Sequence, residues 1–496
     1  MRRLTILPIE NLASDPAMSG DAAAIQLAIW DALQAQPALH AVQASHRREL
    51  PEFRPAYVVD GYVASGRFQL QLNNDPVTCA GTLADCAARL VADIASRVGV
   101  TPRPMPTVAS LRLAANSGAS GRSPDALEIA AKTDPAFSAL WLGWAGEEQT
   151  RGGVTAALAV LNRAPLASMP PFDAARLRLR LAELKQDQSA RSAAMVALAR
   201  TSPADMDLQG KAAQVAATGR DFANAAQIYD QLIAAAPDPR FLNQAAYLAA
   251  FMGDRAKAER FAGAAQAAAP NDPTYGDTRG EIAYFFDDFA AASQYFEQNT
   301  NLNIAFLNGL DLWKAADAAR NAGDKPRAAA LLGRYLDSLT KAGLRNTLVL
   351  QAVWDWRGDA PESAIEKLRA ATDTTERGKA LFLLTLMALN RRDFAAAQAY
   401  RRQLEPNAIE SAFLGSLIDG TPLPPAIPFP AEAIAALHHY LRGNNKAALD
   451  SYAIAKTKID PFAEGQWRKL EAALNGRKAQ GLLPASPDDW LAVLLR

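Results

Sequence analysis

The chain has 496 residues, which argues against a single hydrophobic core, because such cores rarely extend beyond roughly 250 to 300 residues. Its 52 basic residues equal its 52 acidic residues, so no net positive charge draws it to nucleic acid or to anionic lipid. Half of the residues are hydrophobic but only 7% are aromatic, which is typical of helices that pack closely through small side chains and favours an α-solenoid.

Residues 1–100 predict a small α/β domain, and residues 101–108, which are rich in proline, predict a linker after it. The opening run LTILPI reads as a buried strand, and the polar stretch ENLASDP that follows reads as a turn. The first predicted helix places Ile25, Ile29 and Leu33 on one face. The predicted elements, in order, are a strand at 4–9, a helix at 21–36, a strand at 39–44, a hairpin across 56–74 that turns at Ser65 and Gly66, and a helix at 83–99 that ends at Gly99.

The two cysteines, Cys79 and Cys86, are seven residues apart. We interpret them as two buried thiols, with a disulfide as the alternative, since a metal site would need further ligands. The sequence begins without a hydrophobic leader and contains no run of about eighteen apolar residues. We therefore expect a cytoplasmic protein without membrane insertion, or a periplasmic one if the chain is cut from a longer, membrane-anchored protein. A disulfide would contradict the cytoplasmic prediction.

The first hundred residues, with LPIENLASDP at their start and YVVDGYVASGRFQLQL in the middle, resemble the TolB amino-terminal-like domain. The opening motif is matched by Leu7, Pro8, Asn11, Leu12, Asp15 and Pro16, and the second motif by Gly61 and Val63. In bacteria this domain is found fused to tetratricopeptide repeats in adenylate cyclase-like proteins, winged-helix regulators and serine/threonine kinases. The resemblance therefore implies a signalling context and lends no catalytic residue.

From residue 109 onward the sequence repeats itself about every 34 residues, and each unit reads as helix, tight turn, helix. Glycines such as Gly219, Gly253 and Gly323 mark the turns. A methyl-sized residue follows five or six positions later, where the two helices cross closely, at Ala225, Ala258, Ala292, Ala328, Ala364 and Ala397. Bulky residues come one helical turn further on, at Tyr229, Phe296, Leu332 and Leu368.

These marks resemble the tetratricopeptide repeat (TPR) family, and the resemblance covers roughly residues 109 to 475. We predict a right-handed superhelix of eight or nine hairpins: a solenoid at 109–416, a proline-rich spacer at 417–430, and a terminal unit with a capping helix at 431–496. The capping helix is predicted from SPDDWLAVLLR, with Asp488 and Asp489 in its first turn.

Catalytic and metal-binding motifs are not found in the sequence. The adjacent His438 and His439 point about 100 degrees apart on a helix, so they cannot chelate one metal ion. The stretch SGASG at 117–121 is interpreted as a flexible connection. The adjacent aspartates Asp287–Asp288 and Asp488–Asp489 are interpreted as turn or cap residues. We therefore expect a protein that is not an enzyme and that has no cofactor and no metal.

The remaining candidate is the concave surface, which the first helix of each repeat lines in stacked helical pairs. Aromatic and charged side chains there could anchor a protein or peptide partner, although the aromatic ones could instead fill the core between repeats. The predicted residues are Asn243, Tyr247, Phe251, Asp277, Glu281, Tyr284, Trp313, Asp317, Arg320 and Trp356. The leading hypothesis is a protein-interaction scaffold. A sensory or regulatory accessory module is the alternative, an enzyme such as a hydrolase is a weak third, and self-association stays open.

Overall fold

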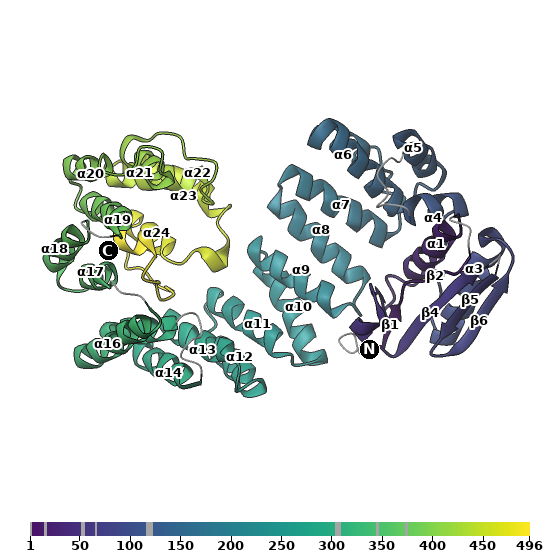
Figure 1. The fold of residues 1–496 in the computed structure, drawn as a ribbon, viewed down its shortest axis with the longest axis horizontal. Coiled ribbons are helices and arrows are strands. Elements are labelled where there is room, and N and C mark those ends of the chain that lie inside the picture. The colour runs from purple at the N-terminus through teal and green to yellow at the C-terminus, as the bar shows by residue number, and fades with distance from the viewer. Residues whose placement is uncertain are drawn as a thin grey trace. The chain divides into compact units, whose positions relative to one another are not determined.

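A computed structural model of the chain describes residues 2–13, 17–50, 55–64, 67–115, 123–302, 309–343, 347–372 and 375–496. It contains two compact units, residues 1–228 and residues 229–496 (Figure 1). The boundary lies within helix α10 (Phe222–Ala235). The predicted linker at 101–108 therefore does not separate the two units.

The first unit begins with a mixed β-sheet in the strand order β3-β1-β4-β5-β6, and β2 pairs with β4 away from this path. Strands β1, β3 and β4 pair in parallel, whereas β4, β5 and β6 form an antiparallel meander (Figure 1). The strand bounds are β1 Arg2–Ile6, β2 Glu10–Asn11, β3 Leu39–Gln43, β4 Tyr57–Ala64, β5 Arg67–Leu72 and β6 Asp75–Ala80. The predicted α/β order is confirmed.

Two strands were not expected. Glu10 and Asn11, predicted as part of a turn, form β2 and pair with Tyr62 and Val63. The predicted hairpin continues into a third antiparallel strand, β6. This strand was not predicted because it contains Pro76, a residue that is rare within strands. Proline is tolerated there because β6 is the edge strand of the sheet that the described residues form. The expected turn at Ser65 and Gly66 lies outside the described residues.

Helices α1 (Ala17–Ala32) and α3 (Leu83–Val98) pack with the sheet in one hydrophobic core. Ile25, Ile29 and Leu33 are fully buried, as the predicted helix face requires. Helix α3 begins with a capping box in which Thr82 and Asp85 bond each other's backbone N–H, and it ends at Gly99 in the left-handed conformation. The hydrogen bond from Thr82 is the main cause that lowers the pKa of Asp85.

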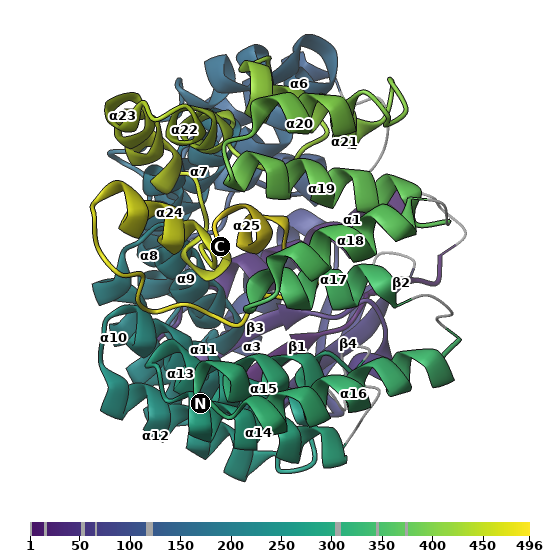
Figure 2. The same cartoon turned by 90° about the vertical axis from the view of Figure 1, so that its left-hand side faces the viewer.

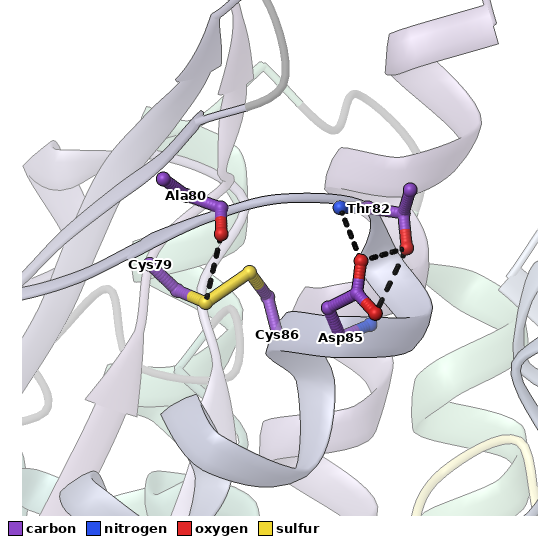
Figure 3. Close-up of a disulfide and its surroundings, with 5 residues drawn as sticks. All are labelled: Cys79, Ala80, Thr82, Asp85 and Cys86. Carbon is purple, nitrogen blue, oxygen red and sulfur yellow. Dashed lines mark hydrogen bonds between the residues drawn. A yellow bond between two sulfur atoms is a disulfide. The ribbon is translucent and has the colours of Figure 1, made fainter.

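Cys79 on β6 and Cys86 on α3 form a disulfide with a Cα–Cα distance of 5.7 Å (Figure 3). The expectation of two free thiols is therefore wrong, and the alternative is correct. The bond can form because strand alternation points Cys79 toward the core and helical periodicity points Cys86 toward the same core, which the spacing of the two residues alone does not show. The bond fastens an edge strand to the helix that follows it.

Replacing both cysteines with serine should lower the free energy of unfolding of residues 1–228 by about 2 to 3 kcal/mol, because a loop of this length then regains entropy in the unfolded chain. Urea unfolding with and without dithiothreitol measures the effect. The reductant should destabilise the native protein by a similar amount and leave the double variant unchanged. A native protein indifferent to the reductant would contradict the role assigned to the bond.

The remaining helices of the first unit continue the same core. Leu111, Leu127 and Trp141 belong to one buried cluster together with Leu4 and Val59 of the sheet, so the core passes across residues 101–107 without a break. The stretch SGASG at 117–121 lies outside the described residues. The helices are α4 Val108–Ala115, α5 Pro124–Thr133, α6 Ser138–Leu161 with a kink at Gly153, α7 Pro171–Lys185, α8 Gln188–Thr201 and α9 Met206–Thr218.

The second unit consists of paired antiparallel helices that follow one another in a curve (Figures 1 and 2). The pairs are α11 Pro239–Phe251 with α12 Arg255–Ala268, α13 Pro273–Phe285 with α14 Phe289–Leu302, α15 Leu310–Asn321 with α16 Lys325–Lys341, α17 Leu348–Arg357 with α18 Pro361–Ala371, α19 Arg377–Asn390 with α20 Phe394–Arg401, and α22 Ala431–Leu441 with α23 Asn445–Lys456. Helix α21 spans Ile409–Asp419 and α24 spans Trp467–Leu474, so the proline-rich spacer starts at Gly420 and not at Leu417.

The turns within the pairs α11–α12, α13–α14, α15–α16 and α19–α20 share one construction, whereas those of α17–α18 and α22–α23 lack the aspartate cap. A residue with positive φ ends the first helix, and an aspartate follows directly and caps the second helix, as Gly253 and Asp254 illustrate. The turn at Gly219 differs in one respect from the others, because its left-handed residue is Arg220. A side chain at position 219 would instead press on Ser192, whose Cβ lies 3.0 Å from the position of the added Cβ.

The methyl-sized contacts are confirmed. All six predicted alanines are buried, and so are Tyr229, Phe296 and Leu368 among the predicted bulky residues, whereas Leu332 is only partly buried. The ring of Phe296 lies against Gly280, where an added Cβ would come within 2.5 Å of it. Close crossing of the helices therefore depends on these small residues, as the sequence pattern indicated.

Candidate functional site

The inner face of the second unit is formed by the first helix of each pair, and the predicted residues lie along it. Asn243, Tyr247 and Phe251 come from α11, Asp277, Glu281 and Tyr284 from α13, Trp313, Asp317 and Arg320 from α15, and Trp356 from α17. Trp313, Asp317 and Trp356 are at most 1% exposed, whereas Tyr247, Phe251, Glu281 and Arg320 are partly exposed. The structure therefore brings the ten residues to one face but leaves few of them open.

Lys314 is the centre of a first polar cluster on this face. Its Nζ donates to Asp277 at 2.6 Å and to Glu281 at 2.7 Å, and the Tyr247 hydroxyl donates to Glu281 at 2.6 Å. Burial and then the neighbouring Glu281 raise the pKa of Asp277. Burial alone would lower the pKa of Lys314, but the two carboxylates outweigh it and raise that pKa. The cluster ties α11, α13 and α15 together.

Asp317 is the centre of a second cluster. Its carboxylate accepts hydrogen bonds from Tyr284 at 2.7 Å and from Arg357 at 3.2 Å, and it also pairs with Arg320. Burial would raise the pKa of Asp317, but Arg357 and Arg320 outweigh it and lower that pKa. The guanidinium of Arg320 also lies 4.1 Å from the ring centre of Trp354. These charges hold successive repeats together and are satisfied within the chain.

The chain's own carboxyl-terminal region covers the inner face. We call residues 461–496 the inner segment; it comprises the short turn Pro461–Ala463, helix α24, an extended stretch and helix α25 (Trp490–Leu494). Figure 2 shows α25 and the carboxyl terminus inside the curve of helices, where α25 contacts α17 and α19. The indole N–H of Trp313 donates to the carbonyl of Ala485 at 3.0 Å, and that of Trp356 donates to the carbonyl of Val493 at 2.9 Å.

Further contacts bind the inner segment along its length. The ring of Phe462 packs edge-on against Tyr247 and Phe251, with ring centres 6.2 Å and 5.0 Å away. Arg357 Nη1 donates to the carbonyl of Ala485 at 3.1 Å, and Asn390 Nδ2 donates to that of Leu494 at 2.9 Å. Side chains of the repeats therefore bond backbone carbonyls of the inner segment, in its extended stretch at Ala485 and at the end of helix α25.

The last helix was predicted as a cap at the end of the stack, and this prediction is wrong. Helix α25 inserts into the inner face, and Asp489 is its N-cap, accepting from the backbone N–H of Leu491 and Ala492. The sequence WLAVLL contains a signal that could have been read. A terminal cap needs a polar outer face, whereas Leu491 to Leu495 are all apolar and all buried.

Residues of the inner segment were not among the predicted site residues. Lys469, Lys478, Gln466 and Arg496 line a pocket of about 370 Å³ together with Tyr284, Asp287, Phe289, Asp317, Arg320, Asn321, Arg357, Ala479, Leu482 and Ala492. Local sequence patterns could not have found this pocket, because its two sides lie more than one hundred residues apart in the chain.

The described residues contain no group of three or more histidine, cysteine, aspartate or glutamate side chains placed to hold a metal ion. His438 Nδ1 lies 2.9 Å from the carbonyl of Leu417, which makes it part of the packing between α21 and α22. None of the described helices is long and apolar enough to cross a bilayer.

A scan against protein-family models finds no match, and neither does a search of curated protein sequences. Among solved structures, the chain is similar to a tetratricopeptide repeat protein from Parabacteroides merdae, with 15% identity, a TM-score of 0.28, and coverage of 45% of this chain and 87% of that one. It is also similar to Naa15/Naa10 bound to HypK-THB, with 16% identity, a TM-score of 0.35, and coverage of 71% and 63%. Human IFIT1, solved as a dimer with PPP-AAAA, has 15% identity, a TM-score of 0.26, and coverage of 74% and 77%.

These scores are too low to carry an argument, so the fold class follows from the chain's own elements. The helices are paired, the repeats step by about 34 residues, and the contacts at their crossings are methyl-sized. The chain is a small mixed β-sheet domain with helices, followed by an all-α repeat region of the TPR-like kind.

Proposed function

We propose that the protein is a non-enzymatic interaction scaffold whose inner face binds a peptide segment of a partner protein. One observation carries this proposal: the inner face already holds a peptide segment, residues 482–496, whose extended part bonds Trp313 and whose helix α25 bonds Trp356 through the indole N–H groups. Hydrogen bonds to backbone carbonyls do not depend on side-chain identity, so a partner segment with similar apolar residues can make them as well.

The partner would have to compete with a tethered ligand. A segment of the same chain is present at an effective concentration in the millimolar range, which weakens the apparent affinity for any external peptide. Weakly binding partners would therefore not displace the inner segment. Only a partner that presents aromatic and aliphatic anchors comparable to Trp490 and Leu491 would do so.

The test is the full-length double variant Leu491→Asp/Leu494→Asp, in which two buried leucines become charged and the inner segment detaches. Fluorescence anisotropy measures binding of a labelled peptide with the sequence of residues 482–496. We expect the variant to bind this peptide at least about tenfold more tightly than the native chain does. A peptide with alanine in place of Trp490 should bind less tightly.

The matched control is Leu449→Asp on α23, where leucine is already 38% exposed. This variant should behave like the native chain. Circular dichroism establishes that the helices of the double variant remain folded. A folded double variant that fails to bind the peptide would refute the proposal that the inner face is a peptide site.

A regulatory accessory role is the second candidate, and the β-sheet domain supports it. The two motifs that resemble the TolB amino-terminal-like domain meet in one ladder, because Asn11 pairs with Val63. Gly61 has φ +143°, and a Cβ there would lie 2.2 Å from the carbonyl of Gln69, so this motif position requires glycine. Asp15 and Pro16 of the opening motif lie outside the described residues.

We also infer that the protein works in an oxidising compartment, which the disulfide between Cys79 and Cys86 supports. This inference replaces the expectation of a cytoplasmic location with the periplasmic alternative. Mass spectrometry of alkylated protein from the host measures the redox state of the two cysteines. Recovery of both as free thiols would overturn the inference.

A further inference from the structure

The pocket of about 370 Å³ on the inner face lies between repeat helices and the inner segment. Its lining carries five basic residues, Arg320, Arg357, Lys469, Lys478 and Arg496, and two acidic ones, Asp287 and Asp317. Asp317 is already paired with Arg320 and Arg357. The pocket therefore has an excess of positive charge that its own carboxylates do not neutralise.

Lys469 contributes most directly to this excess. It is partly buried, and it makes no side-chain hydrogen bond or ion pair within the described part of the chain. Burial and the nearby Arg357 lower its pKa, while Asp317 and Asp489 oppose this change. Asp489 is engaged as the N-cap of α25. Retaining an unpaired ammonium group there costs stability unless an anion accompanies it.

Gln466 supplies a second feature of the same pocket. It is 5% exposed, its Nε2 donates to the carbonyl of Leu483, and its Oε1 accepts no hydrogen bond from the described residues. A buried acceptor without a donor is uncommon, although this atom is itself covered and does not face the open part of the pocket. Phe289, Leu482 and Ala492 add apolar surface to the lining.

We propose that this pocket binds a small organic anion whose oxyanion group lies against Lys469. Lys478 and Arg496 stand at the same pocket and add to its attraction for the anion. Since the pocket includes residues of both the repeats and the inner segment, such a ligand would stabilise the docked position of the inner segment.

Isothermal titration calorimetry of the full chain tests the site with citrate, glucose 6-phosphate, inorganic phosphate and uncharged glucose. We expect citrate or glucose 6-phosphate to bind and glucose not to bind; which of the two binds identifies a carboxylate or a phosphate as the oxyanion. Lys469→Met should weaken binding at least about tenfold, because a charge-assisted hydrogen bond is lost.

The control is Lys446→Met, which removes an exposed lysine on α23 and should leave binding unchanged. A second readout separates the site from a structural role: without ligand, Lys469→Met should melt at the same or a higher temperature than the native chain, since it removes a buried, unpaired charge. Binding of none of the three anions to the native chain would overturn the proposal. Equal binding by Lys469→Met, or a lowered melting temperature of that variant, would also overturn it.

Discussion

Replacing Asp317 with alanine should lower the free energy of unfolding of residues 229–496 by about 3 to 5 kcal/mol. The carboxylate is 1% exposed and pairs with Arg320 and Arg357 while accepting from Tyr284. Its removal leaves two guanidinium groups near each other without a counter-ion. Urea unfolding gives the change, and hydrogen exchange assigns it to the second unit.

The free energy of unfolding should also depend on pH, and the direction of this change follows from the pKa of Asp317. The pKa of Asp317 in the folded chain lies below its ordinary value of 3.8, so the unfolded chain takes up the proton first as the pH falls. The stabilisation is therefore complete above that value and is lost as the pH falls through the folded pKa. The variant should lose less stability than the native chain between pH 5 and about pH 3. The control is Asp337→Ala, an exposed position on α16. It should change neither the free energy of unfolding nor its pH dependence by more than about 0.5 kcal/mol.

Trp356→Ala is expected to cost about 3 to 5 kcal/mol, because it empties a fully buried site and removes the hydrogen bond to Val493. Trp356→Phe retains most of the apolar contact but leaves the carbonyl of Val493 without its donor, which should cost about 1 to 3 kcal/mol. Hydrogen exchange of the amides at 490–496 should speed up in both variants.

Ile454→Ala on α23 is the control, since this side chain is 52% exposed and truncation there should cost little. If the amides at 490–496 exchanged at native rates in Trp356→Ala, the indole would not be what secures α25.

The repeat region could be predicted because its determinants are local. Ala258 and Ala292 recur at the same step because each helical crossing requires a small side chain, and both are fully buried. The aspartates that cap the second helices, such as Asp254 and Asp324, follow the same register. Tyr247, Glu281 and Asp317 could likewise be placed on one face, by counting helix positions back from each turn.

What occupies that face could not be predicted in this way. The partner of Trp313 is Ala485, 172 residues further along the chain, and no periodic pattern connects the two positions. The sequence left open whether the tryptophans would fill the core or anchor a partner. The structure shows that Trp313 and Trp356 are buried beneath a segment of the same chain, and whether a partner replaces that segment stays a prediction. The disulfide was misjudged for a related reason, since spacing alone does not bring two sulfur atoms together.

The docking of residues 482–496 has a consequence for how the second unit acquires its structure. In an open array each hairpin needs only its neighbours, so folding can start at any repeat and spread. Here, closing the loop between Trp313 and Ala485 costs roughly 4 to 5 kcal/mol of chain entropy, because about 170 residues separate them. While the ribosome is still adding residue 481, both indole N–H groups therefore lack their acceptors and the inner face is uncovered, so we expect a chaperone to recognise the nascent chain until this late contact forms.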